Sequence, residues 1–126
     1  MHQGSVQVKG AGLLYPFSAL NAKGNGYLLF SLSGKNNYPS PAYIACNGAT
    51  GPHGPVRIAT PGTAPEDGFT CYAAFVGPNY GGCRWGDYSG GAAMNGRIYM
   101  ATEMIAPTFR DEISNWATYI WSAPPS

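Results

Sequence analysis

Short apolar runs separated by glycine, proline and asparagine make up most of the chain, and none follows the 3.6-residue period of an amphipathic helix of useful length. Some runs alternate polar and apolar residues and others are continuously apolar over about four to eight positions, as in β-strands. The predicted strands cover residues 5–9, 13–21, 27–32, 41–46, 56–59, 69–76, 89–94, 97–105 and 116–121. This pattern predicts an all-β fold.

Turn-forming residues mark the connections between these strands. Residues 22–26 predict a hairpin turn because Asn and Gly both accept a positive φ, and Asn95-Gly96 predicts another. Pro16 interrupts the second strand, which a central position in a sheet would not tolerate. The longer predicted connections are residues 33–40, 47–55, 60–68 and 106–112.

A weak internal repeat relates the two halves of the chain. Tyr15 to Ser18 aligns with Gly86 to Ser89, 71 positions later, and Asn25-Gly26 recurs 70 positions later as Asn95-Gly96. Repeated units usually need stacked neighbours to bury their hydrophobic faces. The single domain, residues 1–126, is therefore predicted to hold two antiparallel four-stranded β-propeller blades, over residues 5–76 and 77–123. Propellers have about four to eight blades, so further blades or self-association would have to complete the ring.

Composition supports an all-β domain and narrows the choice of partner. The chain has 18 Gly and 11 Pro, yet 13% of its residues are aromatic and only 10% are charged. Disordered chains show the opposite balance of aromatic and charged residues, so we assign the Gly and Pro to turns. The net charge is +1 and the cations are scattered, which argues against nucleic acid as a partner. The sequence contains no apolar stretch of about 18 residues, so no membrane-spanning helix is predicted. No signal peptide is visible in it.

Three cysteines are present, and two interpretations of them stay open. The spacings between Cys46, Cys71 and Cys83 match no paired zinc signature. A Cys71–Cys83 disulfide is favoured weakly, because both residues flank a connection rich in Gly, Pro and Asn. The alternative is that all three are small buried hydrophobic residues.

The motifs of the second half resemble a known family. They are RWGDYS at residues 84–89, NG at 95–96, MATE at 100–103 and NWAT at 115–118. Together they are similar to the C-terminal blades of secreted bacterial proteins with a sialidase-like (BNR-type) β-propeller. The resemblance extends over most of residues 5–123, and it implies a propeller fold and an extracellular or periplasmic location.

The chain departs from the sialidases of that family at the functional positions. The repeated Asp box is absent, because Asn95-Gly96 retains only its turn. Sialidases bind the substrate carboxylate with three arginines. The candidate arginines of this chain lie in no recognisable sialidase context; they are Arg57, Arg84, Arg97 and Arg110. No catalytic residue is therefore assigned.

The candidate ligand-binding residues are Arg84, Trp85, Asp87, Tyr88 and Glu103. Aromatic faces stack on pyranose rings, while Arg and Asp form hydrogen bonds with hydroxyl groups, so these residue types fit a sugar-binding patch. The structural alternative, which we favour, is a buried Arg84–Asp87 ion pair at a blade corner with Trp85 packed between blades.

Two further functional interpretations of the acidic residues have less support from the sequence. Asp87 and Glu103 are a candidate glycosidase pair, which requires carboxylates about 5–9.5 Å apart, but Glu103 is equally able to pair with Arg97 or Arg110. The acidic residues that a calcium site would use show no regular loop spacing; they are Asp87, Glu103, Asp111 and Glu112. Neither His2 nor His53 lies near a metal pattern, and no phosphate-binding loop occurs, so no metal or cofactor is predicted.

The expected function is that of a non-catalytic, secreted structural or binding module whose ligand is a carbohydrate or another protein. One alternative is a part of a glycoside-acting hydrolase whose active site needs residues from missing blades. The other alternative is an oligomeric two-blade lectin or scaffold, in which identical chains close a ring.

Overall fold

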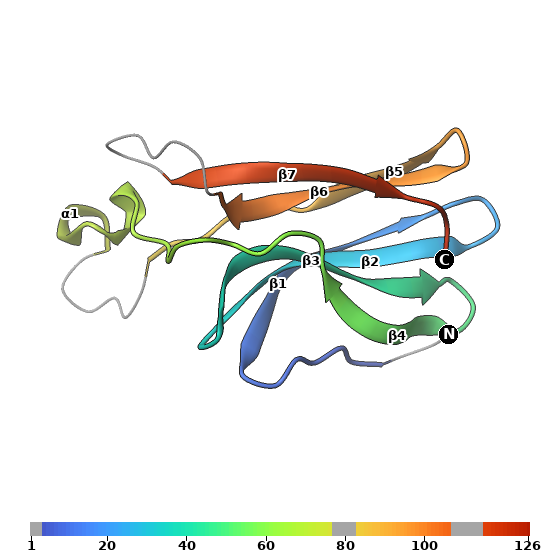
Figure 1. Ribbon diagram of the computed structural model, residues 1–126, viewed down its shortest axis with the longest axis horizontal. Coiled ribbons are helices and arrows are strands. Elements are labelled where there is room, and N and C mark those ends of the chain that lie inside the picture. Colours follow the sequence, from blue (N-terminus) through green and yellow to red (C-terminus); the bar gives the residue numbers. More distant parts are fainter. Residues whose placement is uncertain (1–3, 77–82, 107–114) are drawn as a thin grey trace.

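In the computed structural model, residues 4–76, 83–106 and 115–126 are described, and the fold is all-β. Sheet A consists of β1 (Ala11–Leu20), β2 (Asn25–Gly34), β3 (Asn37–Asn47) and β4 (Gly51–Ile58), in that spatial order. Sheet B consists of β5 (Gly90–Met94), β6 (Arg97–Ile105) and β7 (Trp116–Ala123). The 3-10 helix η1 (Phe69–Cys71) and the short helix α1 (Ala73–Val76) lie beyond one end of the sheets (Figure 1).

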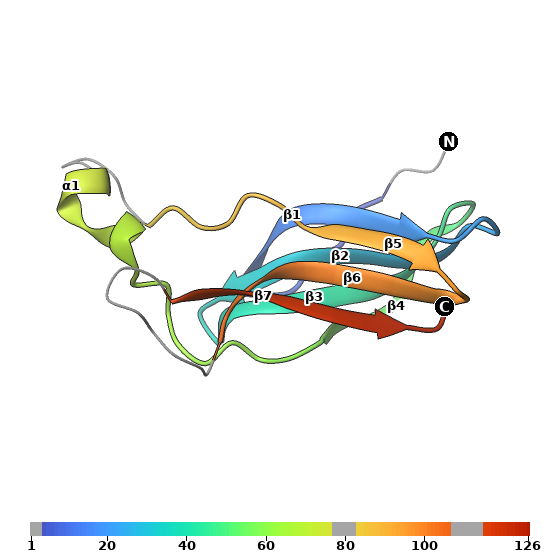
Figure 2. The ribbon, with the colours of Figure 1, turned by 90° about the horizontal axis from the view of Figure 1, so that it is seen from above.

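The two sheets are antiparallel, open and stacked face to face, with their strands in the same order. β1 contacts β5, while β2 and β3 contact β6. Figure 2 shows this overlap from above, with β5 beside β1 and β6 over β2. β4 makes no substantial contact with any strand of sheet B. The structure is therefore a two-layer arrangement, and neither sheet closes on itself.

Sheet A buries apolar side chains on both of its faces. Leu29 packs between the sheets in a cluster with Ala19, Ile98 and Met100. The neighbouring residue Phe30 points to the opposite face, because successive side chains of a strand alternate.

On that outer face, a second cluster is completed by the N-terminal segment. Phe30 and Ile44 are buried there, and Val6 and Val8 pack against them. Burial on both faces explains why residues 27–32 read as an almost continuous apolar run.

The hairpin turns have the expected chemistry, with one shift in position. Asn95 and Gly96 have φ values of 50° and 73°, which confirms the predicted Asn-Gly turn between β5 and β6. In the first hairpin the positive φ of 82° falls on Gly24, and Asn25 already belongs to β2. The side chain of Asn21 holds this turn, since its Oδ1 accepts hydrogen bonds from the backbone N–H groups of Lys23 and Asn25.

Two predicted loops are mostly strand. Only residues 35–36 turn between β2 and β3, so the loop prediction for residues 33–40 was wrong at both ends. Residues 51–55 form the first part of β4 and not a turn. Pro52 and Pro55 suggested a turn, but an edge strand tolerates proline because one side of its backbone needs no partner.

Residues 69–76 are not a strand, although the apolar residues there predicted one. They form η1 and α1, and Cys71 is linked by a disulfide to Cys83. The backbone N–H groups of Cys71 and Tyr72 donate to the carbonyls of Gly68 and Phe69, which closes the chain into tight turns. At the N-terminus, residues 5–9 lie outside the named strands, and only a single bridge joins Val8 to Ala11.

The internal repeat has a structural counterpart in the backbone. Tyr15 and Gly86, which the repeat aligns, both have positive φ values, of 54° and 47°. Sheet B, however, has three strands instead of the predicted four, because no described strand follows β7 in the position that β4 has beside β3.

We predict that the inter-sheet core is the main source of stability, and two methionines of sheet B test this. Met100 is 1% exposed and Met94 is 57% exposed. Met100→Ala should lower the free energy of unfolding by about 2–5 kcal/mol, because it leaves a cavity between the sheets. Met94→Ala should change it by less than about 0.5 kcal/mol. Urea denaturation measures both values, and equal losses would contradict the assignment of the core.

Candidate functional site

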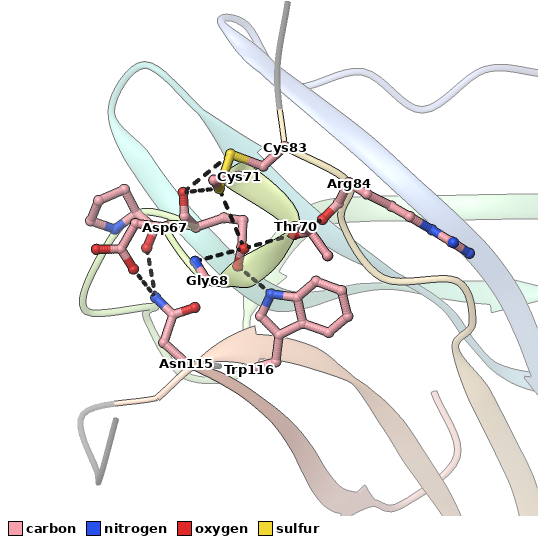
Figure 3. The surroundings of a disulfide bond; sticks show 10 residues. Asp67, Gly68, Thr70, Cys71, Cys83, Arg84, Asn115 and Trp116 are labelled. Atoms are coloured by element: carbon pink, nitrogen blue, oxygen red, sulfur yellow. Dashed lines mark hydrogen bonds between the residues drawn. A yellow bond between two sulfur atoms is a disulfide. The ribbon is translucent and has the colours of Figure 1, made fainter. Parts of the chain in front are cut away.

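A disulfide anchors the segment that carries the RWGDYS motif. Cys71 and Cys83 are joined with their Cα atoms 4.4 Å apart, which confirms the pairing that the sequence favoured. Figure 3 shows the bridge beside Thr70 and Arg84 at the end of the sheets. The third cysteine, Cys46, is free and buried on β3. The disulfide therefore fixes the start of the segment that runs from Cys83 into β5.

Glu66 is the polar centre beneath this disulfide. Its Oε1 accepts a hydrogen bond from the backbone N–H of Gly68 at 3.0 Å and lies 3.2 Å from the Thr70 hydroxyl, whose proton is nearer to the Arg84 carbonyl. Its Oε2 accepts a hydrogen bond from the Trp116 indole N–H. The Asn115 amide ties the same loop to the start of β7 by donating to Asp67 Oδ1 at 2.7 Å.

Sequence reasoning missed the role of Glu66. The available signal was the pair of adjacent carboxylates, Glu66 and Asp67, in a chain with only six acidic residues. The carboxylate acts as a structural anchor, because it joins the backbone of its own turn at Gly68 to Trp116, 50 positions later.

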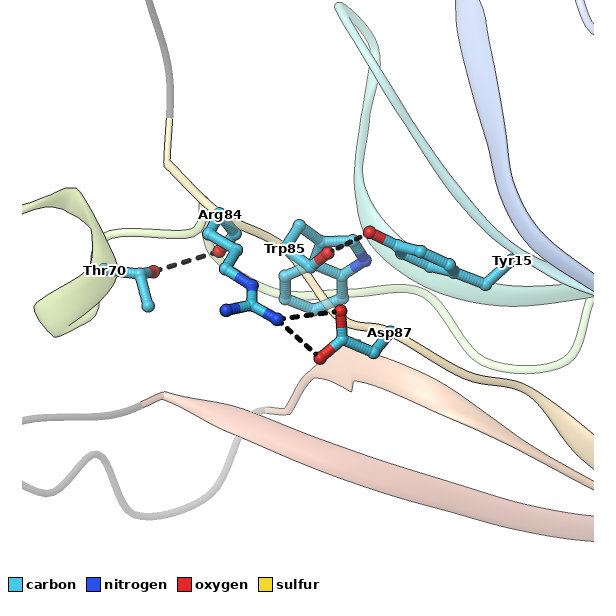
Figure 4. Close-up of polar contacts among 5 residues, drawn as sticks. All are labelled: Tyr15, Thr70, Arg84, Trp85 and Asp87. Carbon is cyan, nitrogen blue, oxygen red and sulfur yellow. Dashed lines mark hydrogen bonds and ion pairs between the residues drawn. The ribbon is translucent and has the colours of Figure 1, made fainter. Parts of the chain in front are cut away.

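The two corners that the repeat aligns touch one another. The Tyr15 hydroxyl donates a 2.6 Å hydrogen bond to the backbone carbonyl of Trp85 (Figure 4). A β-bulge between Leu14 and Phe17 turns the Tyr15 side chain out of the ladder and towards this segment. The Tyr15 ring then lies against Gly86, where a Cβ would come within 3.2 Å of it. Glycine is favoured at residue 86 both by its φ of 47° and by this close approach.

Trp85 is inserted between the sheets. Its indole N–H donates to the Ser31 hydroxyl at 3.1 Å, and Ser31 donates in turn to the Glu103 carbonyl at 3.2 Å. Its ring meets Trp116 edge to face, with the centroids 5.5 Å apart. This position agrees with the structural interpretation of Trp85 drawn from the sequence.

Arg84 and Asp87 form the expected ion pair, but on the surface. Arg84 Nη2 lies 3.0 Å from Asp87 Oδ2, and the two side chains are 68% and 51% exposed. The expectation of a buried pair was therefore wrong. Water competes for both groups, so the pair adds little stability. The corner is held instead by backbone contacts, such as the 3.0 Å hydrogen bond from the Thr70 hydroxyl to the Arg84 carbonyl.

Glu103 lies directly behind the corner. A Cβ on Gly86 would collide with its carboxylate, which accepts a hydrogen bond from the Asp87 backbone N–H. Its Oε2 is buried and has no hydrogen-bond partner among the described residues. Burial, and then the charge of Asp87, raise the pKa of Glu103 above its usual value.

Of the two ion-pair partners proposed for Glu103, only Arg97 can be assessed, and it does not pair with Glu103. Arg97 bonds instead to the hydroxyl and carbonyl of Ser122, and Arg110 lies outside the described residues. Asp111 and Glu112 also lie outside them. Within the described ranges, no three His, Cys, Asp or Glu side chains cluster in a way that would hold a metal ion.

A groove opens beside this corner, and only one of the five predicted ligand residues lines it. It has a volume of about 370 Å³, and its walls include Leu14, Tyr38 and Trp85. Tyr88 is 83% exposed and lies outside the groove, as do Arg84 and Asp87. The sequence did not indicate Tyr38 as a binding residue, since its place beside Trp85 depends on the β2–β3 hairpin.

Comparison with protein-family models, with characterised proteins and with solved structures finds no match to this chain. The resemblance to sialidase-like propellers therefore stays a prediction from the motifs. No helix among the residues with a described structure is long and apolar enough to span a membrane.

We predict that the Tyr15 hydroxyl stabilises the corner. Tyr15→Phe should lower the free energy of unfolding by about 1 kcal/mol, because the half-buried Trp85 carbonyl loses its donor. Tyr88→Phe removes the same atom from a side chain that is 83% exposed and should change stability very little. Chemical denaturation of both variants measures the difference. Equal effects would show that the Tyr15 hydroxyl does not stabilise the corner.

Glu103 should make stability depend on pH. Because its pKa is raised in the folded state, the charged form is penalised there, and stability should fall as the pH rises from the usual Glu pKa of about 4.3 through the folded value. Glu103→Gln has no charge to lose, so the variant should gain stability relative to the native chain between pH 4 and pH 7. Urea denaturation at both pH values measures this gain, and a pH-independent difference would contradict the assignment.

Proposed function

We propose that the chain is a non-catalytic carbohydrate-binding module whose ligand occupies the groove beside Trp85. The observation that carries this proposal is the pairing of an exposed aromatic ring with open polar groups in one groove. Tyr38 is 50% exposed and lines the groove together with Leu14 and Trp85. Aromatic faces of this kind stack on the C–H face of a pyranose ring.

The polar groups of the groove are available to a ligand. Ser33 and Asn37 line it, and neither side chain forms a hydrogen bond within the part of the chain that the structure describes. A hydroxyl and a carboxamide both donate and accept, so they match the hydroxyl groups of a neutral sugar. Few charged side chains surround them, which favours a neutral glycan over a charged one.

The wider context that we propose is a secreted propeller. The shared strand order of sheets A and B, and the positive φ at the aligned residues Tyr15 and Gly86, support two consecutive blades. The Cys71–Cys83 disulfide supports export, because disulfides persist in oxidising compartments. Closure of a ring by identical chains is less favoured, since Val6 and Val8 cover the outer face of sheet A that such a ring would use.

A glycoside-acting enzyme is the second candidate, and the raised pKa of Glu103 beside Asp87 is the observation that favours it. Opposed to it is the position of the carboxylate, which lies behind the Gly86 backbone and away from the groove. Turnover of aryl glycosides that is lost in both Glu103→Gln and Asp87→Asn would establish the enzyme in place of the binding module.

The binding proposal predicts different behaviour for two tyrosines. A glycan array first identifies a bound saccharide, and calorimetry with that saccharide then compares the variants. Tyr38→Ala should weaken binding by about tenfold or more, since one aromatic stacking contact is lost. Tyr88→Ala is the matched control and should bind like the native chain, because Tyr88 lies outside the groove.

Two results would contradict this proposal. Binding that depends on Tyr88 and not on Tyr38 would place the ligand on the exposed face of the RWGDYS segment. An array without signal for a chain whose folding is verified by circular dichroism would remove carbohydrate as the ligand.

A further inference from the structure

The four edge strands of the two sheets are protected to different degrees. β1 carries a bulge and Pro16, β4 contains Pro52 and Pro55, and β5 is only five residues long. Bulges, prolines and short length are the usual means by which edge strands avoid pairing with other chains. β7 is eight residues long and contains no proline, glycine or charged residue. β7 is therefore the one described edge without such protection.

β7 is also regular along its whole length. It pairs with β6 without a break from Trp116 opposite Ile105 to Ala123 opposite Ile98. Among the described residues, no backbone group outside β6 bonds to it. Ile120, at the middle of the strand, is 70% exposed. The outward N–H and C=O groups of β7 thus form a template for an added strand.

The internal repeat identifies the same position as incomplete. In sheet A, β4 lies on the outer side of β3, while in sheet B no described strand lies on the outer side of β7. β4 has no substantial contact with sheet B, so no strand of sheet B covers it next to this position.

A second groove, of about 280 Å³, lies beside β4, and Ser126 at the C-terminus lines one part of it. Its walls include Tyr43, His53, Pro55 and Arg57. Arg57 pairs with Tyr43 in the ladder between β3 and β4, and the Tyr43 ring contacts Trp121 of β7 with the centroids 5.9 Å apart. The groove therefore lies alongside the inner face of β7.

The charge in the groove indicates what would fill it. His53 and Arg57 are both exposed, and no carboxylate pairs with Arg57 within the ranges that the structure describes. A strand added beside β7 places alternate side chains on the face that points towards β4. An acidic side chain on that face would meet an unpaired guanidinium, which binds carboxylates strongly.

We propose that β7 is a docking edge for an extended, acidic segment of a partner protein, which adds to sheet B as its fourth strand and places a carboxylate against Arg57. Main-chain hydrogen bonds to β7 supply affinity, and Arg57 supplies the preference for acidic side chains. A second copy of β7 does not meet this requirement, because Trp116–Ala123 contains no acidic residue. The site is separate from the sugar groove and does not depend on it.

A pair of synthetic peptides tests this proposal on the whole chain. One has the sequence Thr-Glu-Val-Glu-Val-Glu-Thr, and the other has lysine in place of each glutamate. Fluorescence anisotropy of the labelled peptides should show that the glutamate peptide binds about tenfold more tightly or better. Amide hydrogen exchange should slow in β7 when that peptide is bound, while the exchange of β1 and β4 stays unchanged.

Charge variants of the chain complete the test. Arg57→Glu should reverse the preference between the two peptides, and Arg57→Gln should abolish it. Lys35→Glu reverses a charge in the turn between β2 and β3, outside the groove, and should leave the preference intact.

Three results would overturn the proposal. The first is equal affinity for the two peptides, or no binding of either. The second is a preference that survives in Arg57→Glu. The third is a dimer, found by light scattering without peptide, whose formation protects the amides of β7, since β7 would then pair with a second copy.

Discussion

The hydrogen bond from the Trp85 indole to Ser31 is the contact on which the arrangement of the two sheets depends. Through it, the segment before β5 is bonded to β2. Ser31 in turn donates a hydrogen bond to the Glu103 carbonyl of β6. Ser31 is 1% exposed, so an unpaired hydroxyl there would cost about 1–3 kcal/mol. The apolar cluster between the sheets has little directional preference, and the other polar contacts, such as Tyr27 to the Pro124 carbonyl, lie at or beyond the strand ends. This polar relay therefore defines how they align at the end that carries the groove.

The same relay explains why structural and functional roles overlap at the RWGDYS segment. Trp85 is a wall of the groove and also ties the sheets together, so its replacement would disturb the fold as well as any binding. Tyr38 has no such second role among its described contacts, since it is half exposed on a hairpin. The side chains that first suggested a site, Arg84 and Asp87, satisfy each other in solvent. The binding that we propose is therefore assigned to the wall of the groove and not to the motif as a whole.

Local sequence patterns predicted the elements that local forces determine. The limits of β6 and its Asn95-Gly96 turn were predicted correctly, because apolar alternation and positive φ act over neighbouring residues. The elements that were not predicted depend on contacts between residues far apart in the sequence. The turns at residues 69–76 depend on Cys83, and the anchoring role of Glu66 depends on Trp116, 50 positions later. To predict the proline-containing strand β4, one would have to know that it lies at the edge of the sheet.

The outer edges of sheets A and B differ in how far the chain itself covers them, which limits how the molecule can assemble. On sheet A, β4 completes the ladder, and Val6 and Val8 pack on the outer apolar cluster. On sheet B, the corresponding edge at β7 has no described partner. Head-to-tail repetition of identical chains needs two complementary free surfaces, one on each side. Because Val6 and Val8 cover the outer face of sheet A and the prolines of β4 disfavour pairing at its free edge, the docking that we propose at β7 would add one partner and then stop.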